Sequence, residues 1–289
     1  MQIKDFFNLI RIKQYSKNFF LFAPAFFAAK LTNPQVLLSL ISALIAFSLV
    51  ASSVYIFNDL QDRAEDKKHP EKNKRPLVTG AITAKQAKII MVLMAFLGLG
   101  LAILINFEFL ILLIGYSILM VFYSWKLKHI ALIDVFIIAL GFVMRILAGG
   151  IVAQVFISSW LIITTFLLAL FLALTKRRAD LRLYQKTGTR VRKAIEGYNQ
   201  EFLDAIIVIM AVATIIAYLM YTFSPQVFER FHTDQLYITG VFVVFGILRY
   251  LQLAFVYQKS VNPSEVLLTD RILQVDLILW LATFAYIIY

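Results

Sequence analysis

The chain reads Asn58-Asp59-Leu60-Gln61-Asp62-Arg63-Ala64-Glu65-Asp66 directly after a long apolar segment, residues 36–57. In a helix, where each residue turns by about 100°, Asp59, Asp62 and Asp66 fall within about 60° of one another, and Asn58 lies about 40° beyond Asp62. The four side chains therefore form one acidic stripe, at the point where an apolar helix becomes polar.

The composition around this stripe is that of a membrane protein. Of 289 residues, 61% are hydrophobic and 16% are charged, and the mean hydropathy is +0.81. An average soluble domain is roughly 45–50% apolar and about 25% charged, so a soluble globular enzyme is excluded. The formal net charge is +11, but the apolar bulk leaves no room for a separate nucleic-acid-binding domain, and nucleic acid is not an expected partner. Because the chain has no cysteine, disulfides and thiolate metal sites are excluded as well.

Nine apolar stretches approach the length of about 20 residues that a helix needs to cross a membrane. We predict an all-α polytopic membrane protein with spans near residues 18–30, 36–57, 86–105, 107–125, 130–153, 160–175, 203–223, 236–257 and 272–289. No linker is long enough to divide the chain. Residues 1–289 are therefore expected to form a single domain, in which the loops 58–85 and 176–202 make a polar mouth.

The distribution of Lys and Arg predicts the orientation. Segments 1–17, 58–85, 126–129, 176–202 and 258–271 carry 4, 7, 2, 8 and 2 of these residues, 23 of the 28 in the chain. Cytoplasmic loops are enriched in Lys and Arg. The N-terminus is therefore predicted to be cytoplasmic, the C-terminus to lie outside, and the polar mouth to face the cytoplasm.

The acidic stripe indicates a metal site, because three carboxylates on one helical face repel one another unless a cation neutralises them. Hard oxygen ligands suit Mg²⁺, which proteins often share with the phosphates of a substrate. The alternative is a solvated helix end with ordinary surface acids, but at a membrane mouth we favour a metal and diphosphate site. In the basic loop that follows, Arg75 stands beside a proline and is the candidate for a bidentate phosphate contact.

The stretch NDLQDRAEDKKHPEKNKRP, residues 58–76, resembles the NDxxDxxxD motif of the UbiA-type prenyltransferase superfamily. The resemblance implies a bundle of nine transmembrane helices that binds a diphosphate through Mg²⁺. Members that use prenyl diphosphates carry a second motif, similar to DxxxD, after the sixth helix. The corresponding stretch here is Lys176-Arg-Arg-Ala-Asp180-Leu-Arg-Leu-Tyr184, in which one carboxylate remains and the rest of the loop is basic.

This departure is similar to one branch of the superfamily, the decaprenyl-phosphate phosphoribosyltransferases. The similarity extends through short stretches at residues 11–18, 69–76, 123–134, 141–149, 176–180 and 267–271. It implies transfer of a phosphoribosyl group from phosphoribosyl pyrophosphate to a polyprenyl phosphate, with release of pyrophosphate, at a bacterial plasma membrane. Membrane lipids are then further partners, and a homo-oligomer is compatible with the family.

The resemblance and the charge pattern together give the candidate site residues. The expected catalytic residues are Asn58, Asp62 and Asp66, and the expected Mg²⁺ ligands are Asp59, Asp62 and Asp66. The candidates for binding substrate are Lys17, Arg75, Tyr123, Lys128, Arg145, Lys176, Arg177, Asp180 and Tyr198. No general base is expected, because the attacking lipid phosphate is already an anion.

Several of these candidates have a structural alternative. Arg145 lies inside an apolar span, where an unpaired guanidinium costs at least ~2.5 kcal/mol and normally faces a cavity or the bundle interior; its alternative is a pair with Asp134. The expectation that a guanidinium within a span faces a cavity or the bundle interior is weaker for Arg249 in the eighth span. Asp180 has the spacing of an i, i+4 pair with Lys176. The two tyrosines are equally typical of the membrane interface.

Two other functions remain open at this point. One is an aromatic prenyltransferase of quinone or haem biosynthesis, with the same fold and metal but a prenyl diphosphate donor; the missing second acidic motif argues against it. The other is a non-catalytic transporter or lipid-binding membrane protein, whose charged residues would mark an ion path. The clustering of polar residues at one face argues against that function.

Overall fold

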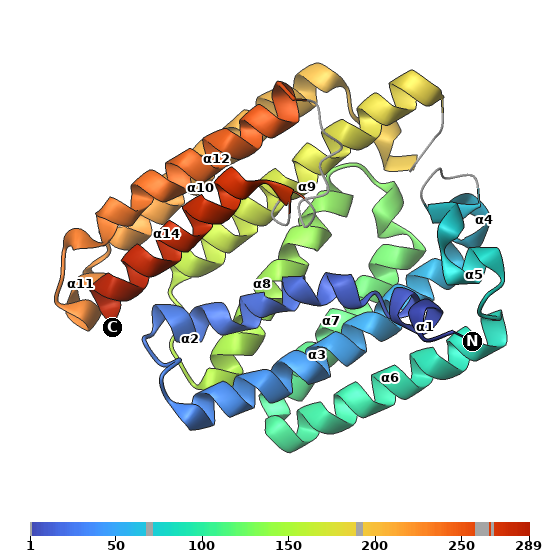
Figure 1. Ribbon diagram of the computed structural model, residues 1–289, viewed down its shortest axis with the longest axis horizontal. Coiled ribbons are helices and arrows are strands. Elements are labelled where there is room, and N and C mark those ends of the chain that lie inside the picture. Colours follow the sequence, from blue (N-terminus) through green and yellow to red (C-terminus); the bar gives the residue numbers. More distant parts are fainter. Residues whose placement is uncertain (1, 68–71, 189–192, 258–265, 267–268) are drawn as a thin grey trace. The chain divides into compact units, whose positions relative to one another are not determined.

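The computed structural model describes residues 2–67, 72–188, 193–257, 266 and 269–289 (Figure 1). Within these ranges every regular element is a helix and none is a strand, so the predicted all-α fold is confirmed. Six residues of the stretches that support the resemblance lie outside the described residues: Lys68, His69, Pro70 and Glu71 of the basic loop, and Leu267 and Leu268 before the last span.

The chain forms two compact units. The first comprises residues 1–156 and 189–194, and the second comprises residues 157–188 and 195–289. The helices of the first unit are α1 (Ile3–Leu9), η1 (Ile12–Phe22), α2 (Ala23–Phe27), α3 (Pro34–Gln61), α4 (Arg63–Asp66), η2 (Lys72–Lys74), α5 (Pro76–Thr79), α6 (Ala84–Ile105), α7 (Phe107–Trp125), η3 (Leu127–His129) and α8 (Ile133–Ala153). Those that follow are α9 (Ser159–Thr187), η4 (Lys193–Gly197), α10 (Gln200–Thr222), α11 (Pro225–Phe231), η5 (Gln235–Thr239), α12 (Gly240–Phe255) and α14 (Arg271–Ile288).

Eight helices in the described ranges are long and apolar enough to cross a membrane: α3, α6, α7, α8, α9, α10, α12 together with η5, and α14. They correspond to the second to ninth predicted spans and make the chain a multi-pass membrane protein. The count of nine is not confirmed. Residues 18–30 form the end of the 3₁₀ helix η1 and the five-residue helix α2, and Ala29 has a left-handed backbone (φ 52°) that ends the run.

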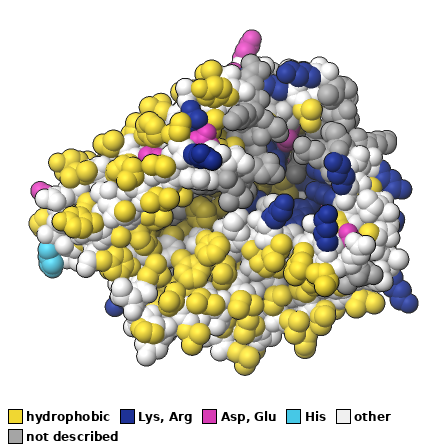
Figure 2. Space-filling view, in the orientation of Figure 1, with side chains coloured by type: hydrophobic (Ala, Val, Ile, Leu, Met, Phe, Trp, Pro, Cys, Tyr) yellow, Lys and Arg dark blue, Asp and Glu magenta, His cyan; other side chains and the backbone are white. Residues whose placement is uncertain are grey.

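The outer faces of the long helices are apolar. On α6, for example, the large side chains of Ile89, Val92, Phe96 and Leu104 are exposed. Figure 2 shows hydrophobic side chains over much of the visible surface, whereas Lys and Arg gather over the end of the first unit that carries α1, α4 and α5. Exposed apolar surface of this extent is what lipid contact requires.

Helix α3 is the central element of the first unit and packs against α6, α7, α8 and η1. It begins at Pro34, whose missing N–H costs nothing at the first helical position, and the side chain of Asn33 accepts hydrogen bonds from the backbone N–H groups of Gln35 and Val36. Its middle is lined by fully buried small residues such as Ala43 and Ala46. The helix therefore runs straight through the core of its unit to the acidic stripe.

Two glycines allow close approach of neighbouring elements. A Cβ at Gly98 of α6 would lie 2.9 Å from the backbone oxygen of Ala46 on α3. A Cβ at Gly149 of α8 would overlap the backbone of Leu21 in η1. Because backbone atoms cannot move aside as a flexible side chain can, η1 can lie against α8 only if position 149 is glycine.

Replacing Gly149 by alanine should lower the stability of the protein, because η1 would have to move away from α8. Overpacking of this kind costs about 1–3 kcal/mol. Thermal unfolding of the detergent-purified protein should show a lower Tm than the wild type. Gly100→Ala on α6 is the matched control, because a Cβ there would meet no atom within 4 Å. Equal Tm values for the two variants would contradict the close contact between η1 and α8.

Candidate active site

The acidic stripe lies at the end of α3 and in α4. Helix α3 ends at Gln61, Asp62 has non-helical backbone angles (φ −86°, ψ 2°), and α4 begins at Arg63. The hydrogen-bond pattern nevertheless continues across the break. The N–H of Asp62 donates to the carbonyl of Asn58 (2.9 Å), and the N–H of Asp66 donates to the carbonyl of Asp62 (2.8 Å). The predicted stripe is therefore present, although the helix that carries it is interrupted.

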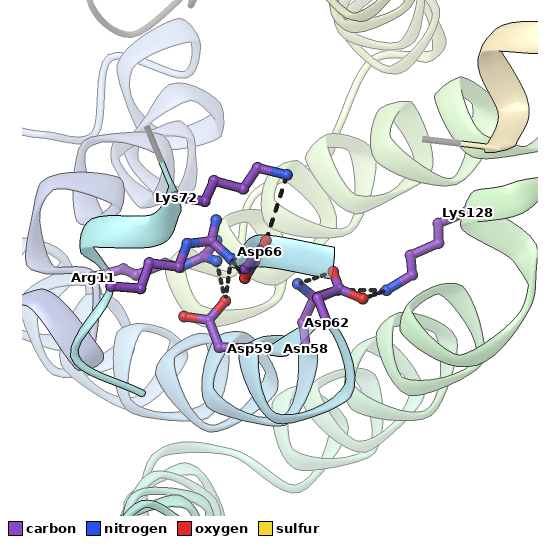
Figure 3. Close-up of polar contacts among 8 residues, drawn as sticks. Arg11, Asn58, Asp59, Asp62, Asp66, Lys72 and Lys128 are labelled. Atoms are coloured by element: carbon purple, nitrogen blue, oxygen red, sulfur yellow. Dashed lines mark hydrogen bonds and ion pairs between the residues drawn. The ribbon is translucent and has the colours of Figure 1, made fainter. Parts of the chain in front are cut away.

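Two carboxylates of the stripe are buried and bound by arginines (Figure 3). The side chain of Asp59 is 5% exposed, and its Oδ1 accepts hydrogen bonds from the guanidinium groups of Arg11 and Arg75, the second at 2.8 Å. The side chain of Asp66 is 3% exposed; its Oδ2 lies 2.5 Å from Nη1 of Arg75, and its Oδ1 lies 3.8 Å from Nζ of Lys72. One nitrogen of Arg75 thus bridges both aspartates.

The third carboxylate, Asp62, forms a separate group with Lys128 and Asn58. Lys128 of η3 forms an ion pair with Oδ1 of Asp62. Oδ2 of Asp62 accepts a hydrogen bond from Nδ2 of Asn58 (3.1 Å), and Nζ of Lys128 lies 3.4 Å from Oδ1 of Asn58. Asp62 is more accessible than the other two aspartates, with 17% of its side chain exposed, while Lys128 is buried.

Among the described residues, four cations contact these three carboxylates: Arg11, Lys72, Arg75 and Lys128. Burial raises the pKa of Asp66, and the charges of Arg75 and Lys72 oppose this rise. Burial and repulsion by Arg11 lower the pKa of Arg75. The cluster carries one positive charge more than it needs to neutralise its own carboxylates, which favours an anionic ligand.

The same cluster offers oxygen ligands without forming a closed metal cage. In the described part of the chain, no three His, Cys, Asp or Glu side chains lie close enough together to hold a metal ion. Mg²⁺, however, is commonly bound by only one or two carboxylates together with the phosphates of a substrate. Asp62, Asp66 and Asn58 supply the hard oxygen atoms for such a shared site, so their chemistry fits the ion that the sequence predicts.

Arg145 of α8 is buried among neutral groups. The residue is 4% exposed. Its Nε donates to Oδ1 of Asn18 (2.8 Å), its Nη1 to the carbonyl of Gly141 (2.6 Å) and its Nη2 to the hydroxyl of Tyr116 (3.1 Å). The ring of Phe47 lies against the guanidinium, 4.8 Å from its carbon. The structure thus gives Arg145 partners other than Asp134, and these partners leave its charge uncompensated.

Lys17 of η1 lies close to this arginine and, among the described residues, has no carboxylate partner. Burial, followed by the charges of Arg145 and Arg11, lowers the pKa of Lys17 to about 8. A lysine whose charge is disfavoured in the free protein gains most when a phosphate binds beside it. Lys17 and Arg145 are therefore a second cationic group in the first unit.

Four predicted site residues lie in the second unit, on or after α9. Helix α9 continues to Thr187, so the loop predicted at 176–202 begins as helix. Nη1 of Arg177 lies 2.7 Å from Oδ2 of Asp180, and Arg177 is 1% exposed. The ion-pair partner of Asp180 is thus Arg177, three residues before it, rather than Lys176. Tyr198 is buried and stacks on Phe202. Tyr123, in the first unit, is half-buried near the end of α7.

Two further arginines of the second unit tie helices together. Arg178 forms an ion pair with Asp204 of α10 and donates to the carbonyl of Ala254 of α12 at 2.9 Å. Nη2 of Arg249 lies 2.8 Å from Oδ2 of Asp270. Because Oδ1 of Asp270 also accepts from the first turn of α14, this aspartate caps the helix and neutralises Arg249 at the same time.

The match to known families agrees with this geometry. The UbiA prenyltransferase family model matches residues 18–267. The chain belongs to the UbiA prenyltransferase family. It is therefore a membrane-bound transferase, and the family resemblance predicted from its motifs is confirmed.

Two bacterial relatives are similar to this UbiA family member over most of its length. The protein is 30% identical over 255 residues to the decaprenyl-phosphate phosphoribosyltransferase of Mycolicibacterium smegmatis, which covers 86% of this chain and 79% of that relative. It is 29% identical over 284 residues to the enzyme of the same name from Corynebacterium glutamicum, covering 97% and 85% of the two chains. A UbiA homolog from Archaeoglobus fulgidus, solved with GPP and Mg²⁺ bound, has the same fold, with a TM-score of 0.73, 21% identity and 98% and 99% of the chains covered.

Sequence patterns did not indicate three residues of this UbiA site: Arg11, Asn18 and Lys72. Arg11 and Asn18 belong to one of the stretches that carry the resemblance, but their spacing gives no sign that Arg11 reaches Asp59, 48 residues away. Lys72 stands in a basic loop that is typical of any cytoplasmic segment. Only the tertiary fold brings these side chains to the stripe and to Arg145.

We expect Mn²⁺, used as a spectroscopic substitute for Mg²⁺, to bind weakly to the protein alone and at least about tenfold more tightly with inorganic pyrophosphate. Alone, the ion must displace Lys128 and Arg75 from their carboxylates, whereas pyrophosphate gives these cations a new partner. Electron paramagnetic resonance titration measures both affinities. Lys128→Met should strengthen the binding of Mn²⁺ alone, because it frees Asp62. Equal Mn²⁺ affinities with and without pyrophosphate would contradict this coupling.

Proposed function

We propose that the protein transfers a 5-phosphoribosyl group from phosphoribosyl pyrophosphate to a polyprenyl phosphate and releases pyrophosphate. The observation that supports it most is the excess of cations over carboxylates in the first unit, where Lys17 and Arg145 add to a cluster that is already positive. A prenyl diphosphate brings one diphosphate, whereas this pair of substrates brings a diphosphate and two further phosphates. The names of the relatives support the same substrates.

The reaction requires one bond to form and one to break. An oxygen of the lipid phosphate attacks C1 of the ribose, and the bond from C1 to pyrophosphate breaks, with the electron pair leaving on pyrophosphate. No proton has to be removed, because the lipid phosphate is already an anion. The protein must therefore hold several phosphates against their mutual repulsion and align the attacking oxygen with C1.

The residues divide between these tasks by their chemistry. Asp62, Asp66 and Asn58 would hold Mg²⁺, which when bound neutralises charge on the leaving pyrophosphate. In the first unit Arg75, Lys128, Lys17 and Arg145 donate to phosphate oxygens. Lys176 and Arg177 of the second unit are cationic candidates for the same kind of contact. Arg177 retains its place on α9 through Asp180. Tyr123 and Tyr198 contribute neutral hydrogen-bond donors.

The reaction is assigned to the cytoplasmic side of a bacterial plasma membrane. The segments predicted to be cytoplasmic hold 23 of the 28 Lys and Arg residues, and the stripe residues Asp62 and Asp66 stand at the start of one of these segments. Both relatives compared above are bacterial. A soluble sugar phosphate reaches this side directly, while the lipid substrate arrives through the bilayer.

A comparison of donors tests the proposed function. Purified protein with Mg²⁺, phosphoribosyl pyrophosphate and polyprenyl phosphate should release pyrophosphate and form a phosphoribosylated lipid. Prenyl diphosphate with 4-hydroxybenzoate should give no prenylated product. Asp62→Asn should lower the rate by about a hundredfold or more, as expected when charge stabilisation of a leaving group is lost, while Glu65→Gln, an exposed neighbour on α4, is the control. Product in the second mixture alone would replace the proposal by aromatic prenyl transfer.

The rate should also fall at alkaline pH as Lys17 loses its proton. Because the pKa of Lys17 is lowered to about 8, its charge is present below that pH and is lost as the pH rises through it. The profile of kcat/KM, which reports groups of the free enzyme, should therefore have an alkaline limb near pH 8. In Lys17→Arg the guanidinium remains charged, and the limb should move to higher pH. An unchanged limb in Lys17→Arg would exclude Lys17 as its origin.

A further inference from the structure

The three aspartates of the stripe do not have equivalent surroundings. Asp62 is the most exposed of them, and it is held by an amine and an amide. Asp59 is buried, and its Oδ1 is bound by two guanidinium groups, those of Arg11 and Arg75. A metal ion on Oδ1 of Asp59 would have to displace both arginines, which is unfavourable in this largely buried setting. On Oδ2 it would meet a carboxylate whose charge two guanidinium groups already neutralise.

The contacts of Arg11 hold its guanidinium group at Asp59. Its backbone is left-handed (φ 54°, ψ 49°), a conformation disfavoured for a residue with a Cβ, and it directly precedes η1. Its guanidinium lies over the ring of Tyr55, 5.1 Å from the ring centre, and reaches Asp59 one helical turn further along α3. The aromatic face and the carboxylate together form a receptor for this one side chain on α3.

The segment that carries Arg11 is also fixed to α3 on either side of it. The hydroxyl of Ser52 donates to the carbonyl of Ile10 (2.9 Å), and Tyr15 shares a hydrogen bond with the same hydroxyl (2.9 Å). The position of Arg11 is therefore determined by contacts that do not involve Asp62 or Asp66. A change of ligand at those two aspartates need not move it.

Arg75, in contrast, is shared between two carboxylates. Its Nη1 lies 2.8 Å from Oδ1 of Asp59 and 2.5 Å from Oδ2 of Asp66. When Asp66 turns to another ligand, Asp59 is the contact that still holds the guanidinium. Since Asp59 already carries Arg11, the charge of Arg75 is then free to act on a phosphate.

We propose that Asp59 is not a metal ligand but a positioning residue, which together with Arg11 holds Arg75 in place for a phosphate of the substrate. This assignment rests on the proposed function and refines it, because it divides the acidic stripe into two parts. Asn58, Asp62 and Asp66 serve the metal, and Asp59 serves the arginines.

The test uses full-length purified protein, Mn²⁺ and inorganic pyrophosphate. Asp59→Asn should bind as many Mn²⁺ ions as the wild type at saturating pyrophosphate, but should need roughly tenfold more pyrophosphate for half-saturation, about the effect of one charge-assisted contact. Asp62→Asn should lose bound Mn²⁺ even at saturating pyrophosphate. Glu65→Gln, which changes an exposed carboxylate on α4, should change neither quantity.

Arg11 variants provide the second arm, and they serve alone if Asp59→Asn does not fold. Arg11→Ala should weaken pyrophosphate binding without lowering the number of bound Mn²⁺ ions, and Arg11→Lys should weaken it less. The double variant of Arg11→Ala and Asp59→Asn should bind pyrophosphate no more weakly than Asp59→Asn alone, because both substitutions remove the same support of Arg75. A merely structural role would lower the Tm but leave the pyrophosphate affinity of the folded protein unchanged.

Two results would overturn the assignment: loss of bound Mn²⁺ in Asp59→Asn to the extent seen in Asp62→Asn, or unchanged pyrophosphate affinity in folded Arg11→Ala. The donor comparison is independent of both. A wild type that binds Mn²⁺ and pyrophosphate as described, but transfers no phosphoribosyl group, would contradict the proposed function and leave the roles of Asp59 and Arg11 standing.

Discussion

The first unit depends on one electrostatic constraint, which is that Asp59 and Asp66, buried at the end of a membrane helix, must be neutralised. Arg11 reaches Asp59 from the segment between α1 and η1. From the segment between α4 and α5, Lys72 reaches Asp66 and Arg75 reaches both aspartates. Lys128 does the same for Asp62 from η3, between α7 and α8. Segments far apart in the sequence are thus brought to the end of α3. The site lies at the end of α3 because the buried carboxylates there require the cations that these segments carry.

Most of the helices could be predicted from the sequence, because length and hydropathy decide whether a helix can cross a membrane. Residues 18–30 are the exception. Part of this stretch packs inside the protein: Leu21 lies against Gly149 of α8, and Nδ2 of Asn18 donates to the hydroxyl of Ser48 on α3. Hydropathy does not distinguish a segment covered by protein from one covered by lipid, and helix length is what separates residues 18–30 from the eight long helices of the described ranges.

The members of the acidic stripe could be predicted as well, because helical spacing alone sets which side chains share a face. Their partners could not. Lys128 and Asp62 are 66 residues apart, and nothing local in either stretch points to the other. On α9 the sequence fails to predict the partner for a different reason. Helix geometry allows Asp180 to pair with the residue three or four positions before it. The choice of Arg177 over Lys176 depends on side-chain packing, which the sequence does not show.

Arg145 and Arg249 show why the function depends on partners rather than on residue type. Both are arginines within predicted spans, and from the sequence both can mark an ion path. Arg249 has Asp270, which neutralises it and caps α14, so its charge is used within the protein. Arg145 has, among the residues that the structure describes, only neutral partners, and its charge repels that of Lys17. One arginine thus completes the fold, whereas the other leaves a positive charge that an anionic ligand can neutralise, as a transferase with a phosphorylated acceptor requires.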